Sequence, residues 1–316
     1  MHRSLVGSML MSSVPYDSIA DSLFDLVGHT PLIRLRRLAD PEGADLCAKL
    51  EAKNPGGSVK DRAARAMLLA AEAAGQLGPG AIIVEATSGN TGISLAMLAA
   101  VRGYRCVIVM PEDMASARQA MLRAYGTEIV LTPAHLGMRG AVDEAERILA
   151  RTPGAFMPRQ FENQENPRAH YDTTAQEIWS QTRGVVDAIV MGVGTGGTLS
   201  GVARYLREKN PRLRVIAVEP RASAVLSGGK PGLHGIQGLG AGFVPSTLDR
   251  GVIDEVLAVS DLDAERMTTR LAREEGLLVG PSSGANVHAA LKVARDLRSK
   301  QRVVTILCDT GERYQS

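Results

Sequence analysis

Short apolar runs alternate with longer helical patterns along most of this chain. The clearest runs are residues 81–84 and 188–191, and runs of this kind are typical of strands that are buried on both faces. Each run is followed by a glycine-containing segment and then by a helical pattern, at 93–101 and up to residue 209. Such strand–helix units recur at 81–101, 105–125, 128–150 and 187–209. They predict parallel sheets with helices on both faces.

The repeating pattern is interrupted at 159–166, where Pro158, Pro167 and several Asn, Gln and Glu residues gather. With 316 residues the chain is long enough for about two domains and a large core. We therefore expect an N-terminal α/β domain at 18–163 and a C-terminal α/β domain at 164–316.

The first 17 residues are interpreted as a separate extension. Arg3 precedes an apolar stretch at 5–11, an order that is also found in export signals. The stretch is short, is interrupted by Gly7 and Ser8, and is followed by no Ala-x-Ala cleavage site. A loose extension at 1–17 is therefore favoured over a signal peptide.

Lys60 is the first candidate for chemistry, in a segment at 54–62 that reads Asn-Pro-Gly-Gly-Ser-Val-Lys-Asp-Arg. A helical pattern follows up to residue 74, so Lys60 is expected in the first helical turn. The positive end of a helix and partial burial both lower the pKa of an amine and favour its neutral, nucleophilic form. A lysine that forms a Schiff base and a solvated lysine paired with Asp61 or Glu51 both fit this segment.

Two glycine-rich segments follow strand-like runs and precede helical patterns. Residues 85–92 read Glu-Ala-Thr-Ser-Gly-Asn-Thr-Gly, and residues 192–198 read Gly-Val-Gly-Thr-Gly-Gly-Thr. Backbone N–H groups in such turns can bind a carboxylate or a phosphate. An ordinary capped helix is the alternative for the first segment. A dinucleotide fingerprint that uses Gly192, Gly194 and Gly197, with Glu219 as its acid, is the alternative for the second.

Residues 280–284, Gly-Pro-Ser-Ser-Gly, match the nucleophile elbow of serine hydrolases. The only later histidine is His288, six residues after Ser282 and in the same helical pattern, so a catalytic triad is excluded. Ser282 is expected to face a ligand from the end of a strand, and a plain helix cap is the alternative.

Together these segments resemble the fold-type II pyridoxal-phosphate enzymes and, among them, the cysteine synthase (O-acetylserine sulfhydrylase) family. The resemblance runs from about residue 18 to the end of the chain. Its carriers are residues 27–32 (Val-Gly-His-Thr-Pro-Leu), 54–62, 87–92, 159–161 (Arg-Gln-Phe), 194–198, 234–238 (His-Gly-Ile-Gln-Gly), 280–284 and 308–314 (Cys-Asp-Thr-Gly-Glu-Arg-Tyr). It implies two three-layer, parallel-sheet domains like the tryptophan synthase β-subunit, with pyridoxal 5'-phosphate in the cleft between them.

The resemblance also implies a role for each matching residue. Lys60 would be the Schiff-base lysine and general base, Asn90 would bond the 3′ oxygen of the cofactor, and Ser282 would meet its pyridine nitrogen. The cofactor phosphate would be held by Gly194, Thr195, Gly196, Gly197 and Thr198. The substrate carboxylate would be held by Thr87, Ser88, Gly89, Thr91 and Gln160.

The implied reaction makes L-cysteine from O-acetyl-L-serine and sulfide by β-replacement through an aminoacrylate intermediate. Residues 240–245, Gly-Ala-Gly-Phe-Val-Pro, look like the sulfhydrylase version of the specificity loop. A cystathionine β-synthase or an O-phosphoserine sulfhydrylase would use the same chemistry on other substrates. A nicotinamide-dependent dehydrogenase would explain the glycines and Glu219 but would leave Lys60 and Asn90 without a role.

Composition limits the partners and the compartment. A formal net charge of +2 argues against nucleic acid or an acidic surface as a partner. The six histidines form no metal-binding pattern. Cys47, Cys106 and Cys308 lie far apart within apolar runs and are expected to be buried, reduced thiols of a cytoplasmic protein. By resemblance we also expect a homodimer, and binding of the C-terminal tail of serine acetyltransferase.

Overall fold

The computed structural model describes residues 19–314, so the predicted extension at 1–17 lies outside the described residues. Contacts divide the chain into two units. The first comprises Gly28–Val59 and the chain from Pro167 onward, and the second comprises Lys60–Asn166 with the residues up to Val27. This grouping differs from the two continuous domains expected, because β2 (Asp45–Leu50) pairs in parallel with β10 (Arg302–Leu307) and so joins residues 28–59 to the first unit.

The second unit contains a sheet of four parallel strands in the order β5-β4-β3-β6. The strands are β3 (Ile82–Ala86), β4 (Arg105–Pro111), β5 (Glu128–Thr132) and β6 (Ala155–Phe156). The helices are α2 (Lys60–Ala73), α3 (Asn90–Arg102), α4 (Ser116–Ala124) and α5 (Gly137–Arg151). Successive residues of β3 enter different cores, because side chains alternate across a strand: Ile83 packs with α2 and α3, and Val84 packs with α5.

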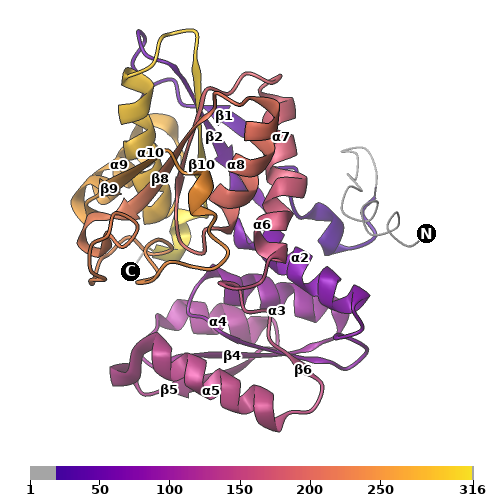
Figure 1. Ribbon diagram of the computed structural model, residues 1–316. Helices are drawn as coiled ribbons and strands as arrows, with labels where there is room; N and C mark the ends of the chain where they lie inside the picture. Colours follow the sequence, from indigo (N-terminus) through magenta and orange to yellow (C-terminus); the bar gives the residue numbers. More distant parts are fainter. Residues whose placement is uncertain (1–18, 315–316) are drawn as a thin grey trace. The chain divides into compact units, whose positions relative to one another are not determined.

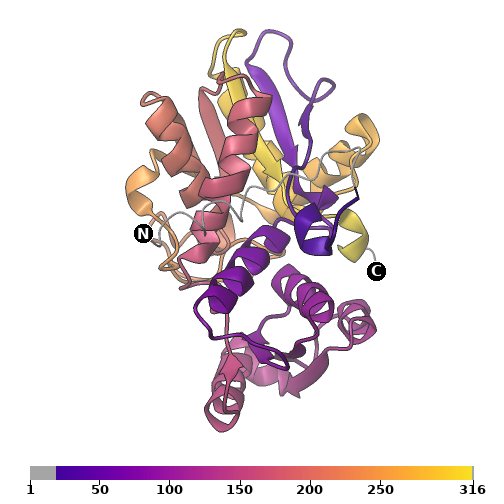
Figure 2. The ribbon, with the colours of Figure 1, turned by 90° about the vertical axis from the view of Figure 1, so that its right-hand side faces the viewer.

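The first unit contains a sheet of six strands in the order β1-β2-β10-β7-β8-β9. It is parallel except for β1 (Leu32–Arg34), which runs antiparallel to β2 at the edge. The other strands are β7 (Ala188–Gly192), β8 (Arg214–Pro220) and β9 (Glu255–Val259). One face is covered by α7 (Ala175–Gln181) and α8 (Gly197–Lys209), and the other by α9 (Asp261–Glu275) and α10 (Pro281–Arg295) (Figures 1 and 2).

Short helical segments complete the described chain. They are η1 (Leu23–Leu26), η2 (Glu51–Lys53), η3 (Ala134–Leu136), α6 (Glu165–Ala169), the π-helix η4 (His170–Thr174), η5 (Arg221–Ser223), η6 (Arg250–Val252) and η7 (Gly311–Tyr314). Two three-layer α/β units therefore make up the described structure, as the alternating pattern predicted.

The cysteine prediction is confirmed in part. Cys47 in β2 and Cys106 in β4 are buried, and burial raises the pKa of the Cys106 thiol to about 12. Cys308 is only partly buried, so the expectation that it lies buried within a strand is wrong. The chain leaves the sheet at Leu307, where β10 ends.

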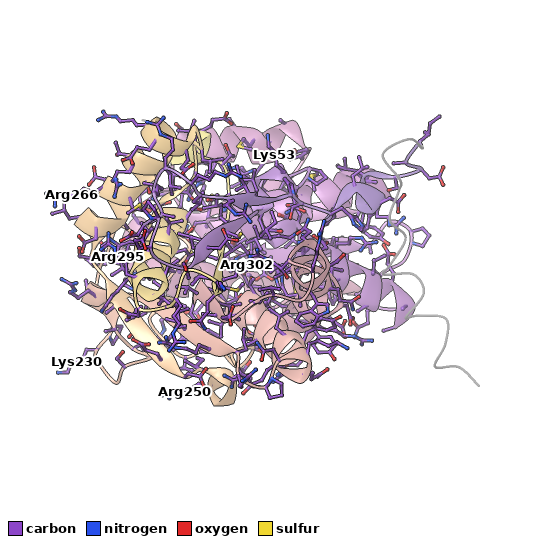
Figure 3. All side chains as sticks on the ribbon, turned by 90° about the horizontal axis from the view of Figure 1, so that it is seen from above. Lys53, Lys230, Arg250, Arg266, Arg295 and Arg302 are labelled. Carbon is purple, nitrogen blue, oxygen red and sulfur yellow. The ribbon has the colours of Figure 1, made fainter. Side chains whose placement is uncertain are left out.

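Basic side chains of the first unit come from different segments, as the dispersed arginines of the sequence indicate. Figure 3 labels six of them, Lys53, Lys230, Arg250, Arg266, Arg295 and Arg302. Arg302 is used internally, since its guanidinium donates to Asp45 at 2.9 Å and to the carbonyl of Thr182 at 3.1 Å. Across residues 19–314, no helix has the length and apolar content that crossing a membrane requires.

Candidate active site

The loop after β3 carries the predicted substrate residues. The strand ends at Ala86, and α3 begins at Asn90 with Gly89 as its N-cap residue. Gly89 has no side chain, so the capped-helix alternative does not describe this turn. The N–H of Gly89 instead donates to Thr87 Oγ1 at 3.3 Å, which curls the loop over the start of the helix. Arg118 of α4 donates to the carbonyl of Ser88 at 3.1 Å and fixes the outer side of the loop.

Gln160 lies beside this loop, as its shared assignment to the substrate carboxylate requires. Thr91 Oγ1 donates to Gln160 Oε1 at 2.6 Å, and both side chains are buried. Asn166 Nδ2 donates to the Gln160 carbonyl at 2.9 Å and holds the backbone of that turn. The second unit thus brings together two of the predicted substrate residues, which lie 69 positions apart in the sequence.

Glu85 is a residue that the sequence analysis did not assign. It is the last but one residue of β3 and only 5% exposed. Its carboxylate accepts from the N–H of Ala86 at 3.2 Å and from the N–H of Arg159 at 2.9 Å. Burial raises the pKa of Glu85 to about 7 against the lowering effect of these N–H donors. The only feature of the sequence that could have pointed to Glu85 is its position as a single acidic residue at the end of an apolar strand-like run.

Lys60 is the first residue of α2, as predicted. The next residue, Asp61, accepts a hydrogen bond of 2.5 Å from Ser94 of α3. Lys60 and Asn90 are therefore the first residues of two helices of the second unit that contact each other.

The segment before Lys60 belongs to the first unit and is held there at several backbone positions. Gly28 N–H donates to Asn54 Oδ1 at 2.8 Å, and Val59 N–H donates to the Cys308 carbonyl at 2.8 Å. Arg313 donates to the carbonyl of Gly56. Two segments that carry the family resemblance without an assigned role, 27–32 and 308–314, thus hold the backbone of residues 54–59, which precede Lys60.

The glycine-rich loop between β7 and α8 has the shape of an anion-binding turn. The N-terminus of α8 lies at Gly197, after Gly196 in the left-handed conformation with φ of 82°. A Cβ atom at Gly194 would lie 2.3 Å from the carbonyl oxygen of Gly238, and one at Gly196 would lie 2.6 Å from Leu248 Cβ. Only glycine fits both positions, so the loop packs closely against Gly238 and Leu248. A glycine-rich turn at the N-terminus of a helix is the kind of segment that binds phosphate oxygens.

Thr198, in the first turn of α8, contacts a second residue that the sequence analysis did not assign. Its hydroxyl lies 3.2 Å from Nε2 of His170, and Nδ1 of His170 lies 2.9 Å from Thr174 Oγ1. His170 is buried in the π-helix, a form of helix that is frequent at functional sites. One ring nitrogen of His170 thus contacts Thr174 and the other contacts Thr198, so the His170 ring is held between the two hydroxyls.

Ser282 lies in the first turn of α10 and is 3% exposed. The N-cap residue of that helix is Gly280, so Ser282 is not the helix cap that the alternative required. A Cβ atom at Gly238 would lie 3.6 Å from Ser282 Oγ, and Gly238 also abuts Gly194. The glycine-rich loop and a neutral hydroxyl therefore lie close together in the first unit, as their predicted assignments to the phosphate and the ring nitrogen of pyridoxal phosphate require.

Glu219, the acid of the alternative dinucleotide fingerprint, is engaged by its own loop. Its buried carboxylate accepts from the N–H of Leu226 at 2.8 Å and from the N–H and hydroxyl of Ser227 at 3.2 and 2.5 Å. The ribose of a nicotinamide cofactor would have to displace these donors to bind Glu219. The hydrogen bond between acid and ribose that is characteristic of dinucleotide binding is therefore not supported.

The predicted specificity loop at 240–245 lies beside the glycine-rich loop between β7 and α8. Gly240 N–H donates to the Val193 carbonyl at 3.0 Å, and Gly240 and Gly242 both have positive φ. A small cavity lies between the two loops and the segment after β8; its lining includes Gly194, Ser223, Leu226 and Phe243. The predicted specificity loop therefore lies beside the glycine-rich loop between β7 and α8 in this unit.

Comparisons with known proteins identify the family of this chain. Residues 23–309 match the family described as "Pyridoxal-phosphate dependent enzyme", and the chain belongs to this family. Its prediction as a pyridoxal-phosphate-dependent enzyme of fold-type II is confirmed, and pyridoxal phosphate is its cofactor.

Individual relatives show which members of this enzyme family the chain is similar to. The chain is 49% identical to a cysteine synthase of Staphylococcus aureus (strain Mu50 / ATCC 700699) over 297 residues, which cover 94% of this chain and 96% of the relative. A solved O-ureido-L-serine synthase is similar with a TM-score of 0.92, 46% identity and coverage of 95% and 94%. A cysteine synthase of Entamoeba histolytica is similar with a TM-score of 0.91, 41% identity and coverage of 96% and 91%. The predicted resemblance to the cysteine synthase family is confirmed.

Proposed function

We propose that this enzyme makes L-cysteine from O-acetyl-L-serine and sulfide by β-replacement. The observation that carries the proposal is the 49% identity to a cysteine synthase along 94% of the chain. The joined Thr91 and Gln160 side chains, together with the loop at 87–89, supply hydroxyl and amide groups suited to an amino-acid carboxylate.

Each assigned residue binds a particular group of the cofactor or the substrate. Backbone N–H groups from Gly194 to Gly197, with the Thr195 and Thr198 hydroxyls, hold the cofactor phosphate at the N-terminus of α8. Ser282 offers the ring nitrogen a neutral hydroxyl, and Asn90 holds the 3′ oxygen. The substrate carboxylate is held by Thr87, Ser88, Gly89, Thr91 and Gln160.

Lys60 carries the proton transfers. Bound pyridoxal phosphate supplies the electron sink that makes the proton on the substrate α-carbon removable. Lys60 Nζ takes this proton as general base while acetate leaves the β-carbon. Sulfide then bonds to the β-carbon, and Lys60 returns the proton to the α-carbon. The hydroxyl of Ser282 does not hold a proton on the ring nitrogen as a carboxylate would, which favours β-replacement over transamination.

A substrate screen on the holoenzyme tests the proposal. O-acetylserine, O-phosphoserine and serine are each combined with sulfide or homocysteine, and the largest turnover is expected for O-acetylserine with sulfide. A tenfold preference for serine with homocysteine, which equals about 1.4 kcal/mol of transition-state stabilisation, would make the enzyme a cystathionine β-synthase instead. Turnover mainly with O-phosphoserine would indicate the corresponding sulfhydrylase.

The similarity to an O-ureido-L-serine synthase adds a second candidate product. Hydroxyurea in place of sulfide tests it in the same screen. Turnover is expected to be faster with sulfide. Faster formation of O-ureido-L-serine would show that hydroxyurea is the preferred acceptor.

We also propose a homodimer that acts in the cytoplasm and binds the C-terminal tail of serine acetyltransferase. Buried thiols at Cys47 and Cys106 support a reducing compartment. The carboxylate-binding group at 87–91 and Gln160 would receive the terminal carboxylate of the tail, so O-acetylserine is expected to displace a tail peptide in a titration. Failure to compete would contradict the shared site, and light scattering of the holoenzyme tests the dimer.

A further inference from the structure

Glu85 occupies the point where two substrate-binding segments of the second unit meet. One oxygen accepts from Ala86, the residue that leads into the loop at 87–91, and the other accepts from Arg159, the residue before Gln160. Glu85 therefore links these two segments through their backbone N–H groups. The Thr91–Gln160 hydrogen bond of 2.6 Å links the same segments through their side chains.

The Arg159 turn needs such a connection. Arg159 has a φ of 54°, a left-handed conformation that is unfavourable for a residue with a side chain. Its N–H is fixed by Glu85, and its guanidinium makes a two-point contact with Glu146 of α5. Without Glu85, relaxation of this φ would rotate the peptide that leads into Gln160.

We propose that Glu85 is a positioning residue that couples the substrate loop at 87–91 to Gln160, so that both segments bind the carboxylate of the amino-acid substrate as one rigid surface. Glu85 itself touches no substrate. The proposal rests on the proposed assignment of these segments to substrate binding, and it adds a residue that the binding depends on.

The test compares Glu85→Gln with Glu146→Gln. The first variant keeps the size of the side chain but turns one acceptor oxygen into an NH₂ group that faces a backbone N–H donor. The second removes the α5 carboxylate that contacts the Arg159 guanidinium and leaves the Arg159 N–H bond in place. For Glu85→Gln we expect the KM for O-acetylserine to rise about tenfold or more, with kcat and the KM for sulfide changed less than about threefold. Glu146→Gln is expected to behave like the wild type.

A double-mutant cycle distinguishes positioning from a general loss of stability. If Glu85 acts through Gln160, the effects of Glu85→Gln and Gln160→Ala on KM will be less than additive. Additive effects, or a folded Glu85→Gln enzyme with an unchanged KM, would overturn the proposal. If Glu85→Gln does not fold, Glu85→Asp replaces it, because the shorter carboxylate cannot span both N–H donors.

Binding of L-serine, followed by the absorbance of the holoenzyme, separates this proposal from the proposed reaction. It needs no acetyl group and no sulfide. Weaker L-serine binding in Glu85→Gln supports positioning even if the wild type fails to make cysteine, whereas unchanged L-serine binding contradicts it even if cysteine synthesis is confirmed.

Discussion

Ser94 donates a hydrogen bond of 2.5 Å from its hydroxyl to Asp61, and both side chains are completely buried. Asp61 follows Lys60 at the start of α2, and Ser94 lies in the first turns of α3, which begins at Asn90. This bond therefore fixes the relative position of the two helix starts that carry Lys60 and Asn90.

Replacement of Ser94 by alanine is expected to affect both stability and turnover. A buried carboxylate that loses a donor costs about 1–3 kcal/mol, so the free energy of unfolding should fall by about that amount. The kcat should fall as well, because Lys60 is no longer held in register with α3. Urea denaturation and steady-state kinetics measure the two effects. A variant with normal stability and normal kcat would contradict the importance of this link.

Lys60→Ala separates binding from chemistry. The groups that hold the cofactor phosphate and ring remain, so the cofactor should still bind, though more weakly. Loss of the base should lower kcat by several orders of magnitude. Borohydride reduction followed by peptide mapping should attach the cofactor to Lys60 in the wild type and to no lysine in the variant.

Lys53 provides the matched control for this experiment. It is exposed, lies seven residues earlier at the end of η2, and is labelled in Figure 3. Lys53→Ala should retain nearly full activity. Attachment of the cofactor to Lys53 or Lys49, or substantial cysteine synthesis by Lys60→Ala, would refute the assignment of Lys60.

Gly194→Ala tests the phosphate-binding loop. The added Cβ would lie 2.3 Å from the Gly238 oxygen, and neither backbone segment can yield without moving the loop. The affinity for pyridoxal phosphate should fall at least about tenfold, as measured by fluorescence titration of the apoenzyme. Gly78→Ala is the control, since a Cβ there meets no atom within 4 Å. Equal cofactor affinity in the two variants would contradict a phosphate site at this loop.

The sequence was most informative where local pattern decides the structure. The apolar runs at 81–84 and 188–191 became β3 and β7 because strands covered on both faces need apolar residues at every position. The turns after them were predictable for a related reason, since glycines such as Gly196 adopt a conformation that other residues avoid.

Long-range pairing and single polar residues were not predictable. The pairing of β2 with β10 joins segments about 250 residues apart, and no local pattern encodes which strand lies beside which. Glu85 and His170 look like isolated polar residues in the sequence. Only the fold shows that Glu85 reaches Arg159 and that His170 reaches Thr198.

Glu85 should leave a signature in the pH dependence of stability. Burial raises its pKa in the folded protein from about 4.5 to about 7, despite the backbone donors of Arg159, Ala86 and Gln160 and the nearby Arg159 guanidinium. The Cys106 thiol faces it from β4, with a pKa raised to about 12 by burial. Because the folded state holds the proton more tightly, stability falls as pH rises from about 4.5 to about 7, by about 3 kcal/mol.

Glu85→Gln removes this titration. Urea denaturation between pH 4.5 and 7.5 should show that the wild type loses stability relative to the variant as pH rises. Parallel curves for the two proteins would mean that Glu85 keeps an ordinary pKa. The ionised form above pH 7 is also the one that accepts from both backbone donors, so substrate affinity and stability change in opposite directions with pH.

The last prediction concerns the buried pair of His170 and Thr198. His170→Ala leaves the Thr198 hydroxyl in place but removes the ring nitrogen 3.2 Å away that orients it. One charge-assisted hydrogen bond to phosphate would then be weakened, so the affinity for pyridoxal phosphate should fall about tenfold while the KM for O-acetylserine stays nearly constant. Thr173→Val, in the same π-helix, is the control, because its hydroxyl donates to the Ala169 carbonyl at 2.6 Å. A folded His170→Ala enzyme with unchanged cofactor affinity would show that Thr198 is oriented by other contacts or does not bind the phosphate.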